Sequence, residues 1–297
     1  MLRFATIAGL LLTIAGLIIS WIVAGLLVSP CPSAIGPPPA ELNATAFSIN
    51  SKSGSMIFGW HTQPEHSNGV ILLLHGIRGS RLSMVDRARL LHNHGYSTVL
   101  IDLQSHGQSS GDAITLGHLE KHDVRAAVEF ARHEHPNEKI GIIGVSLGGA
   151  AAVLASPLDI DVLVIESVYP NITDAIHNRV AYKLSPFSSI PASLLLIQLK
   201  LRLGISPSEL RPINYIPDVD CPVYIASGTA DLYTTETESR ELFDAAEEPK
   251  DLWLVNDAAH VDLFRYDPIE YHKRIVGFFD RHMLHSGGFS SELKNDF

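Results

Sequence analysis

With 297 residues the chain can bury a sizeable core and hold one large domain or two small ones. Its formal net charge of −10 argues against a nucleic-acid partner, because phosphate contacts need clustered lysine and arginine. A hydrophobic content of 46% is high for a purely soluble protein, and the start of the chain accounts for much of it.

Residues 1–28 predict a transmembrane anchor. Residues 4–28 contain no charged side chain, and a helix of that length spans about 37 Å, enough to cross a bilayer with some tilt. A cleaved signal peptide is the alternative. Its apolar stretch is normally only ~7–15 residues long, and residues 29–32 (Ser-Pro-Cys-Pro) suit a signal peptidase poorly. The lipid bilayer is therefore an expected partner of residues 4–28.

The orientation of this anchor follows from the charges on either side of it. Arg3 precedes the apolar stretch, whereas the first charges after it are Glu41 and Lys52. The positive-inside tendency places the amino terminus in the cytoplasm and the rest of the chain on the other side of the membrane. Cys31 and Cys221 are too few for a disulfide framework, and two isolated thiols are expected.

Residues 29–45 are expected to form a spacer. They include five prolines and few charges, which predicts a stiff, extended segment that lifts the following domain off the bilayer. A folded domain is expected over residues 46–285, followed by a polar tail over residues 286–297.

Within this domain, short apolar runs alternate with segments of helical periodicity. Strands that are buried on both faces and alternate with helices indicate an α/β domain, with a mostly parallel sheet covered by helices on both sides. The predicted strands are residues 46–49, 56–61, 70–74, 98–102, 140–145, 162–166, 223–227 and 252–255, and the predicted helices are residues 80–94, 116–133, 147–155, 236–246 and 268–282.

Residues 168–219 interrupt this alternation without any strand signal. Residues 191–203 predict a helix that opens near a proline, ends at Gly204 and is rich in leucine. We interpret the segment as a cap whose inner face accepts an acyl or other apolar group. The alternative is that its leucines only pack the cap onto the core.

The strongest chemical signal is the sequence Gly144-Val145-Ser146-Leu147-Gly148, which stands between a predicted strand and a predicted helix. A serine on such a turn is typical of the nucleophile elbow of serine hydrolases. The turn forces the serine into a strained conformation, and a side chain at either glycine would collide with the neighbouring strand or helix. The pattern predicts Ser146 as a nucleophile.

A serine nucleophile needs a base, and the base needs an orienting acid. His260 and Asp231 are the candidates, because each follows a predicted parallel strand, at the sheet edge where α/β proteins place their sites. Glu166 is a rival acid at the end of another strand, and Asp257 and Asp262 lie close to the histidine in sequence. The chain order Ser, Asp, His and the loop position favour Asp231.

The developing negative charge on a substrate oxygen needs hydrogen-bond donors. The amide of Leu147, directly after the nucleophile, is one candidate. Ile77, in the loop after residues 70–74, is expected to supply the second through its backbone N–H. The neighbouring Arg78 could reach a substrate carboxylate, although a solvated surface arginine is the simpler interpretation.

The motifs LLLHGIRGS, DLQSHGQSSG, GVSLGG, SGTAD and AAHVD together resemble the α/β-hydrolase superfamily, most closely serine-aminopeptidase-like and monoacylglycerol-lipase-like hydrolases, over residues 48–282. The resemblance implies an eight-stranded sheet, ester or amide hydrolysis, no cofactor, and a triad of Ser146, Asp231 and His260. One departure is Ser105, where related sequences often carry glycine. His106 is interpreted as a residue that stabilises the fold.

The sequence therefore predicts a membrane-anchored serine hydrolase that acts on small-molecule carboxylic esters. A peptidase, amidase or acyltransferase with the same triad stays open, as does a non-catalytic binding protein on this fold. Three histidine pairs have spacings that metal sites use, but they fall on predicted helices among polar neighbours, so no metal site is predicted. The sequence does not predict the oligomeric state.

Overall fold

The computed structural model describes residues 2–184 and 188–284. Within these residues an eight-stranded sheet has the order β10-β9-β8-β7-β4-β5-β3-β2. The six strands from β10 to β5 run parallel. At one edge, β3 pairs antiparallel with β5, and β2 pairs antiparallel with β3. The strands are β2 Thr45–Asn50, β3 Met56–Thr62, β4 Val70–Leu74, β5 Ser97–Ile101, β7 Ile140–Val145, β8 Val162–Glu166, β9 Val223–Gly228 and β10 Lys250–Val255. The predicted α/β fold with eight strands is confirmed.

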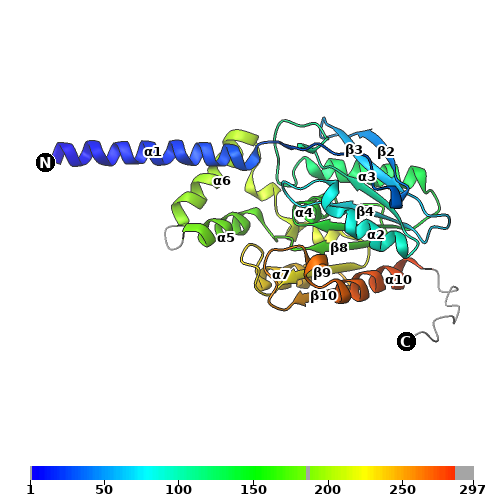
Figure 1. Cartoon of the computed structure of the whole chain (residues 1–297). Coiled ribbons are helices and arrows are strands. Elements are labelled where there is room, and N and C mark those ends of the chain that lie inside the picture. Colours follow the sequence, from blue (N-terminus) through cyan, green and yellow to red (C-terminus); the bar gives the residue numbers. More distant parts are fainter. Residues whose placement is uncertain (1, 185–187, 285–297) are drawn as a thin grey trace.

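Helices cover both faces of this sheet because the side chains of its strands alternate between two cores. In β4, Leu72 packs in one core with α3 and α4, whereas Leu73 packs in the other core with α2 and α10. Figure 1 shows these helices around the sheet. Their bounds are α2 Val85–Asn93, α3 Glu120–Glu134, α4 Leu147–Leu154, α7 Glu236–Ala245, α8 Leu263–Tyr266, α9 Pro268–Tyr271 and α10 Gly277–Met283.

Two predicted helices differ in detail. The helix expected from residue 116 begins only at Glu120, because Leu116 and Gly117 have positive φ angles of 57° and 105° and form a turn. The carboxylate of Glu120 accepts the Gly117 amide at 2.8 Å and holds that turn. The helix expected over residues 268–282 is present, but a π turn at His272–Val276 joins α9 to α10.

The cap over residues 168–219 contains two long helices, α5 Ile172–Leu184 and α6 Ser189–Leu203. The second was predicted, and it ends at Gly204 as expected, with a left-handed φ of 72° and an amide that donates to Lys200 O at 3.1 Å. The first was missed. The sequence signal for this helix is Asn171 as an N-cap, because its side-chain oxygen accepts the amide of Asp174 at 2.9 Å at the start of the helix.

The amino-terminal helix α1 covers Leu2–Val28, and its segment Gly9–Val28 is long and apolar enough to cross a membrane. Its first half projects away from the domain, and its second half lies beside α6 (Figure 1). Polar contacts fix this second half. Gln198 of α6 donates to Ser20 Oγ at 2.8 Å, Arg78 donates to Leu26 O at 3.1 Å, and the amide of Ile114 donates to Val28 O at 2.8 Å.

The proline-rich segment after α1 returns directly to the domain. Its residues Cys31–Pro32 form β1, which pairs in parallel with β6, His106–Gly107. Leu42, in the short 3-10 helix Ala40–Leu42, is buried in the core. Residues 29–45 therefore do not form the expected extended spacer between α1 and the domain, because backbone pairing and α1 packing hold the two together. The predicted tail, residues 286–297, lies outside the described residues.

Candidate active site

Ser146 stands on the sharp turn between β7 and α4, with φ 49° and ψ −108°. A Cβ built on Gly144 would lie 2.5 Å from the Cα of Gly149, and one on Gly148 would lie 2.5 Å from the carbonyl oxygen of Leu74. No real side chain tolerates such distances from backbone atoms. As the sequence predicted, only glycine fits at these two positions, where α4 packs closely against β7 and β4 around the strained Ser146.

We expect Gly148→Ala to lower the unfolding free energy by about 1–3 kcal/mol, because the added methyl group forces α4 and β4 apart. Gly277→Ala is the matched control. Its Cβ would meet nothing within 4 Å, and alanine there is neutral or stabilising by up to about 1 kcal/mol. Thermal unfolding of the full chain in detergent measures both, and equal melting temperatures would contradict the steric explanation.

Asp231 and His260 meet at the carboxyl edge of the sheet. Asp231 follows β9, His260 follows β10, and Asp231 Oδ2 lies 2.7 Å from His260 Nδ1. The other carboxylate oxygen accepts the amides of Tyr233 and Thr234 at 2.8 and 2.9 Å. These bonds fix the buried carboxylate, so His260 Nδ1 carries the proton in this pair and Nε2 is left for another partner.

Ser146 follows β7 at the same edge of the sheet, and its amide donates to Glu166 O at 2.8 Å. In the described part of the chain, no hydrogen bond joins Ser146 Oγ to His260. Catalytic hydrogen bonds are often long in ligand-free structures and tighten when substrate binds. The structure thus joins the predicted acid and base directly and places the predicted nucleophile at the same edge.

The rival acids have other partners. Glu166 is buried and pairs with Arg87 at 2.7 Å, while Tyr271 donates to it at 2.6 Å. Asp262 caps α8 and also contacts Arg87 at 2.8 Å. These two carboxylates share Arg87 as a partner, which leaves Asp231 as the carboxylate bonded to His260.

Two backbone amides are available beside Ser146. Among the described residues, the N–H groups of Ile77 and Leu147 donate to no protein acceptor, and both residues line the cavity that contains Ser146. Leu147 is the first residue of α4, where helix geometry leaves amides without partners. Both predicted oxyanion donors are therefore without a protein acceptor among the described residues, and their residues line the cavity that contains Ser146.

His106 holds the loop that carries one of these donors. Its Nε2 accepts the amide of Arg78 at 3.0 Å, and its Nδ1–H donates to Gln104 O at 2.9 Å. Burial lowers the pKa of His106, so the neutral ring that can accept is favoured. Ser105 before it has a left-handed φ of 63°, which is the physical reason that a glycine suits this position.

His75 also contacts the backbone of this loop. Its Nε2 accepts the amide of Leu103 at 3.1 Å, and its Nδ1–H donates to Gly76 O at 2.8 Å. Burial lowers the pKa of His75 to about 3, so the ring is neutral at physiological pH. A histidine that uses both nitrogens on the backbone is a structural residue.

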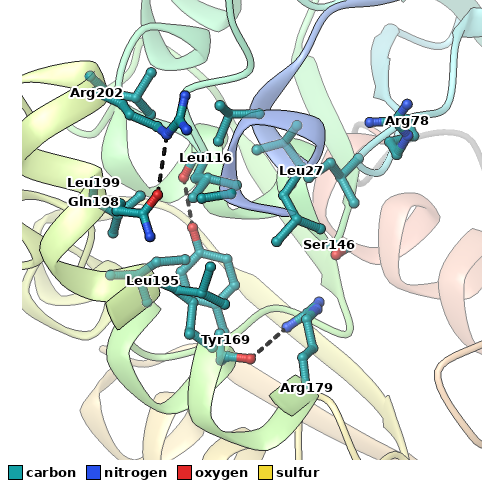
Figure 2. A pocket seen from close by; sticks show the side chains of 18 residues that line it. Leu27, Arg78, Leu116, Ser146, Tyr169, Arg179, Leu195, Gln198, Leu199 and Arg202 are labelled. Carbon is teal, nitrogen blue, oxygen red and sulfur yellow. Dashed lines mark hydrogen bonds between the residues drawn. The ribbon is translucent and has the colours of Figure 1, made fainter. Parts of the chain in front are cut away.

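The cavity at Ser146 has a volume of about 220 Å³. Figure 2 shows Leu27 of α1 and Leu195 of α6 around the space that Ser146 faces. Tyr169 closes one side and donates to Leu116 O at 2.7 Å. The contribution of α1 was not predicted, because hydropathy identifies a span but not the surface against which its end packs. The remaining walls are mostly apolar and come largely from the cap: Ile172, Ala175, Ile176, Leu199 and Leu203.

Comparisons with known proteins find a matching family model and related chains. Residues 65–168, which include Ser146 and Ile77, match the family model described as serine aminopeptidase, S33. The chain is 25% identical over 247 residues to the uncharacterized protein YqkD of Bacillus subtilis, covering 81% of this chain and 80% of that one.

Solved structures show the same fold. The esterase PF2001 of Pyrococcus furiosus superposes with a TM-score of 0.73 at 23% identity, covering 86% of this chain and 98% of that chain. The dienelactone hydrolase of Anabaena variabilis superposes with a TM-score of 0.60 at 18% identity, covering 81% and 98%.

Proposed function

Because the chain has the α/β-hydrolase fold, we propose that it is a serine hydrolase that cleaves carboxylic esters through an acyl-enzyme intermediate. The observation that carries the proposal is the 2.7 Å bond between Asp231 and His260 at the sheet edge where Ser146 stands on its strained turn. Fold alone does not fix a reaction, so the proposal depends on this site.

In the proposed reaction, Ser146 Oγ attacks the ester carbonyl while His260 Nε2 accepts the hydroxyl proton. The carbonyl oxygen becomes an oxyanion, which the amides of Ile77 and Leu147 stabilise. Collapse of the tetrahedral intermediate breaks the C–O bond, and the imidazolium returns its proton to the departing alcohol. Water, deprotonated by His260, then attacks the acyl-serine. The carboxylic acid is released, and Ser146 regains its proton from His260. Asp231 stabilises the imidazolium throughout.

An aminopeptidase reaction is the second candidate, since the matching family model carries that description. Its substrates present a free ammonium group, for which an acidic side chain is the natural partner. The charged residues that line the cavity at Ser146 are Arg78, Arg179 and Arg202, with no aspartate or glutamate among the described lining residues. This charge favours a neutral or anionic ester over an amino-terminal peptide.

We also propose that α1 anchors the protein with its amino terminus in the cytoplasm and the hydrolase domain on the opposite side of the membrane. The support is the apolar segment Gly9–Val28 together with the arginine that precedes it.

One labelling experiment tests both proposals. A membrane-permeant fluorophosphonate is expected to form a stoichiometric adduct on Ser146 in the full chain, and peptide mapping locates the adduct. A charged, impermeant fluorophosphonate is expected to label the same serine in intact cells. Absence of any adduct would contradict the nucleophile, whereas labelling by the permeant probe alone would contradict only the orientation.

A further inference from the structure

A second, larger cavity adjoins the one at Ser146. It has a volume of about 1020 Å³, compared with about 220 Å³ at the serine. The two share Leu27, Ile176, Arg179 and Leu195 as lining residues, so they are adjacent. We call the second cavity the α1 groove. Sites for small molecules usually measure about 300–1,000 Å³, so the cavity at the serine alone holds only the reacting end of a substrate.

The walls of the α1 groove are the amino-terminal helix on one side and the cap helices α5 and α6 on the other. Along α1 its lining runs from Thr13 to Leu27, about 21 Å at 1.5 Å per residue. This length is inside the segment Gly9–Val28 that is apolar enough to cross a bilayer. The groove therefore lies beside the cavity at Ser146 and runs along the segment of α1 that we propose as the membrane anchor.

Helix α6 carries large apolar side chains on its surface, at the groove and on its outer face. Ile190 at the start of α6 is 73% exposed, Ile197 is 57% exposed and Leu201 is 68% exposed. Such a patch on a soluble surface is unfavourable, but the same side chains are stable against hydrocarbon. Since α6 packs along α1 (Figure 1), a membrane crossed by α1 would lie close to these residues of α6.

The lining of the α1 groove fits an uncharged acyl chain that carries a polar group at the end near Ser146. Apolar residues form most of it, and Lys183 and Arg179 are its charged lining residues in the described part of the chain. Arg179 stands where the groove joins the cavity at Ser146, with its guanidinium 4.9 Å from the ring centroid of Tyr233. An acyl chain can follow the apolar walls while its ester group reaches Ser146.

From these observations we propose that the substrate is a lipid ester, whose long acyl chain enters sideways from the bilayer and lies in the α1 groove. The amino-terminal helix is then one wall of the substrate site as well as an anchor. This inference rests on the proposed serine hydrolase function, and it names the substrate class of that same site.

The test compares two fluorophosphonates on the full chain in phosphatidylcholine vesicles: one with a two-carbon chain and one with a sixteen-carbon chain. Gly16→Trp introduces an indole into the groove, since a Cβ at Gly16 meets nothing within 4 Å and Gly16 lines the groove. We expect this variant to react with the long probe at least about tenfold more slowly, the effect of losing apolar contact with about two methylene groups. Its reaction with the short probe should be unchanged.

Gly9→Trp is the matched control, because Gly9 is also open within 4 Å, lies on the same helix and does not line the groove. It should react with both probes like the parent chain. A second pair keeps the test decisive if Gly16→Trp does not fold: Leu194→Trp fills the groove from α6, and Ile197→Trp adds the same bulk on the outer face of α6.

The outcomes separate a failure of the proposed function from a failure of the lipid-ester inference. A parent chain that fails to react with the short probe contradicts the proposed function itself. A parent that reacts with the short probe, but shows no preference for the long one, overturns only the lipid inference. Equal slowing of both probes by Gly16→Trp also overturns it, as does a long-chain preference that survives this substitution undiminished.

Discussion

Ser146→Ala is expected to lower kcat/KM for a short p-nitrophenyl ester by about 10⁴-fold or more, because removal of a triad nucleophile leaves only the contribution of the oxyanion donors and of binding. The helix start, the glycines around the turn and the free amide of Leu147 do not depend on the hydroxyl group. The variant should therefore keep the melting temperature of the parent. Steady-state kinetics in detergent measure the loss, with the adduct assay as a count of active sites in the parent chain.

Ser193→Ala on the exposed face of α6 is the control for this experiment, and it should retain parental kinetics. A Ser146→Ala variant with near-parental turnover would show that another group attacks the ester. The proposed mechanism would then have no nucleophile at the sheet edge.

The second large effect is expected from Asp231→Asn. An amide at this position leaves the geometry in place but favours the wrong tautomer of His260, and the corresponding change in a serine protease triad lowers kcat by about 10⁴-fold. The amides of Tyr233 and Thr234 can still donate to the side-chain oxygen, so folding should be retained. Kinetics and thermal unfolding of the same preparation separate these two effects.

Glu166→Gln is the matched comparison, since Glu166 is the rival carboxylate at the end of β8. Here the expected result is reversed. The unfolding free energy falls by as much as about 3–5 kcal/mol, because buried Arg87 keeps only the partly exposed Asp262 as a charged partner. The kcat of the molecules that remain folded should not change. A large loss of kcat in Glu166→Gln with none in Asp231→Asn would reverse the assignment of the acid.

The parts of the site that the sequence predicted are those determined by local physics. A strand, a turn that tolerates only glycine at two positions and a helix define the place of Ser146 without any tertiary information. Asp231 and His260 follow from topology, because residues after parallel strands gather at one edge of a sheet. Their 2.7 Å bond is the detail that only the structure supplies.

The parts that were missed depend on packing between distant segments. Hydropathy showed that residues 4–28 can cross a membrane, but the contacts of Ser20 and Leu26 come from α6 and from the loop after β4. Prolines in residues 29–45 indicated an extended segment, and they gave no sign that Cys31–Pro32 pairs with His106–Gly107. The helix α5 was missed because its polar and apolar residues lack the strong periodicity of a helix that covers a sheet.

The packing of α1 has a consequence for how this protein can be processed. Ala24, Leu27 and Val28 line the cavity at Ser146, and Leu26 O accepts a hydrogen bond from Arg78, the residue after Ile77. A protease that cut behind Val28 would release a domain whose cavity at Ser146 lacks one wall and whose loop at Arg78 has lost a contact. Removal of α1 is thus incompatible with an intact cavity.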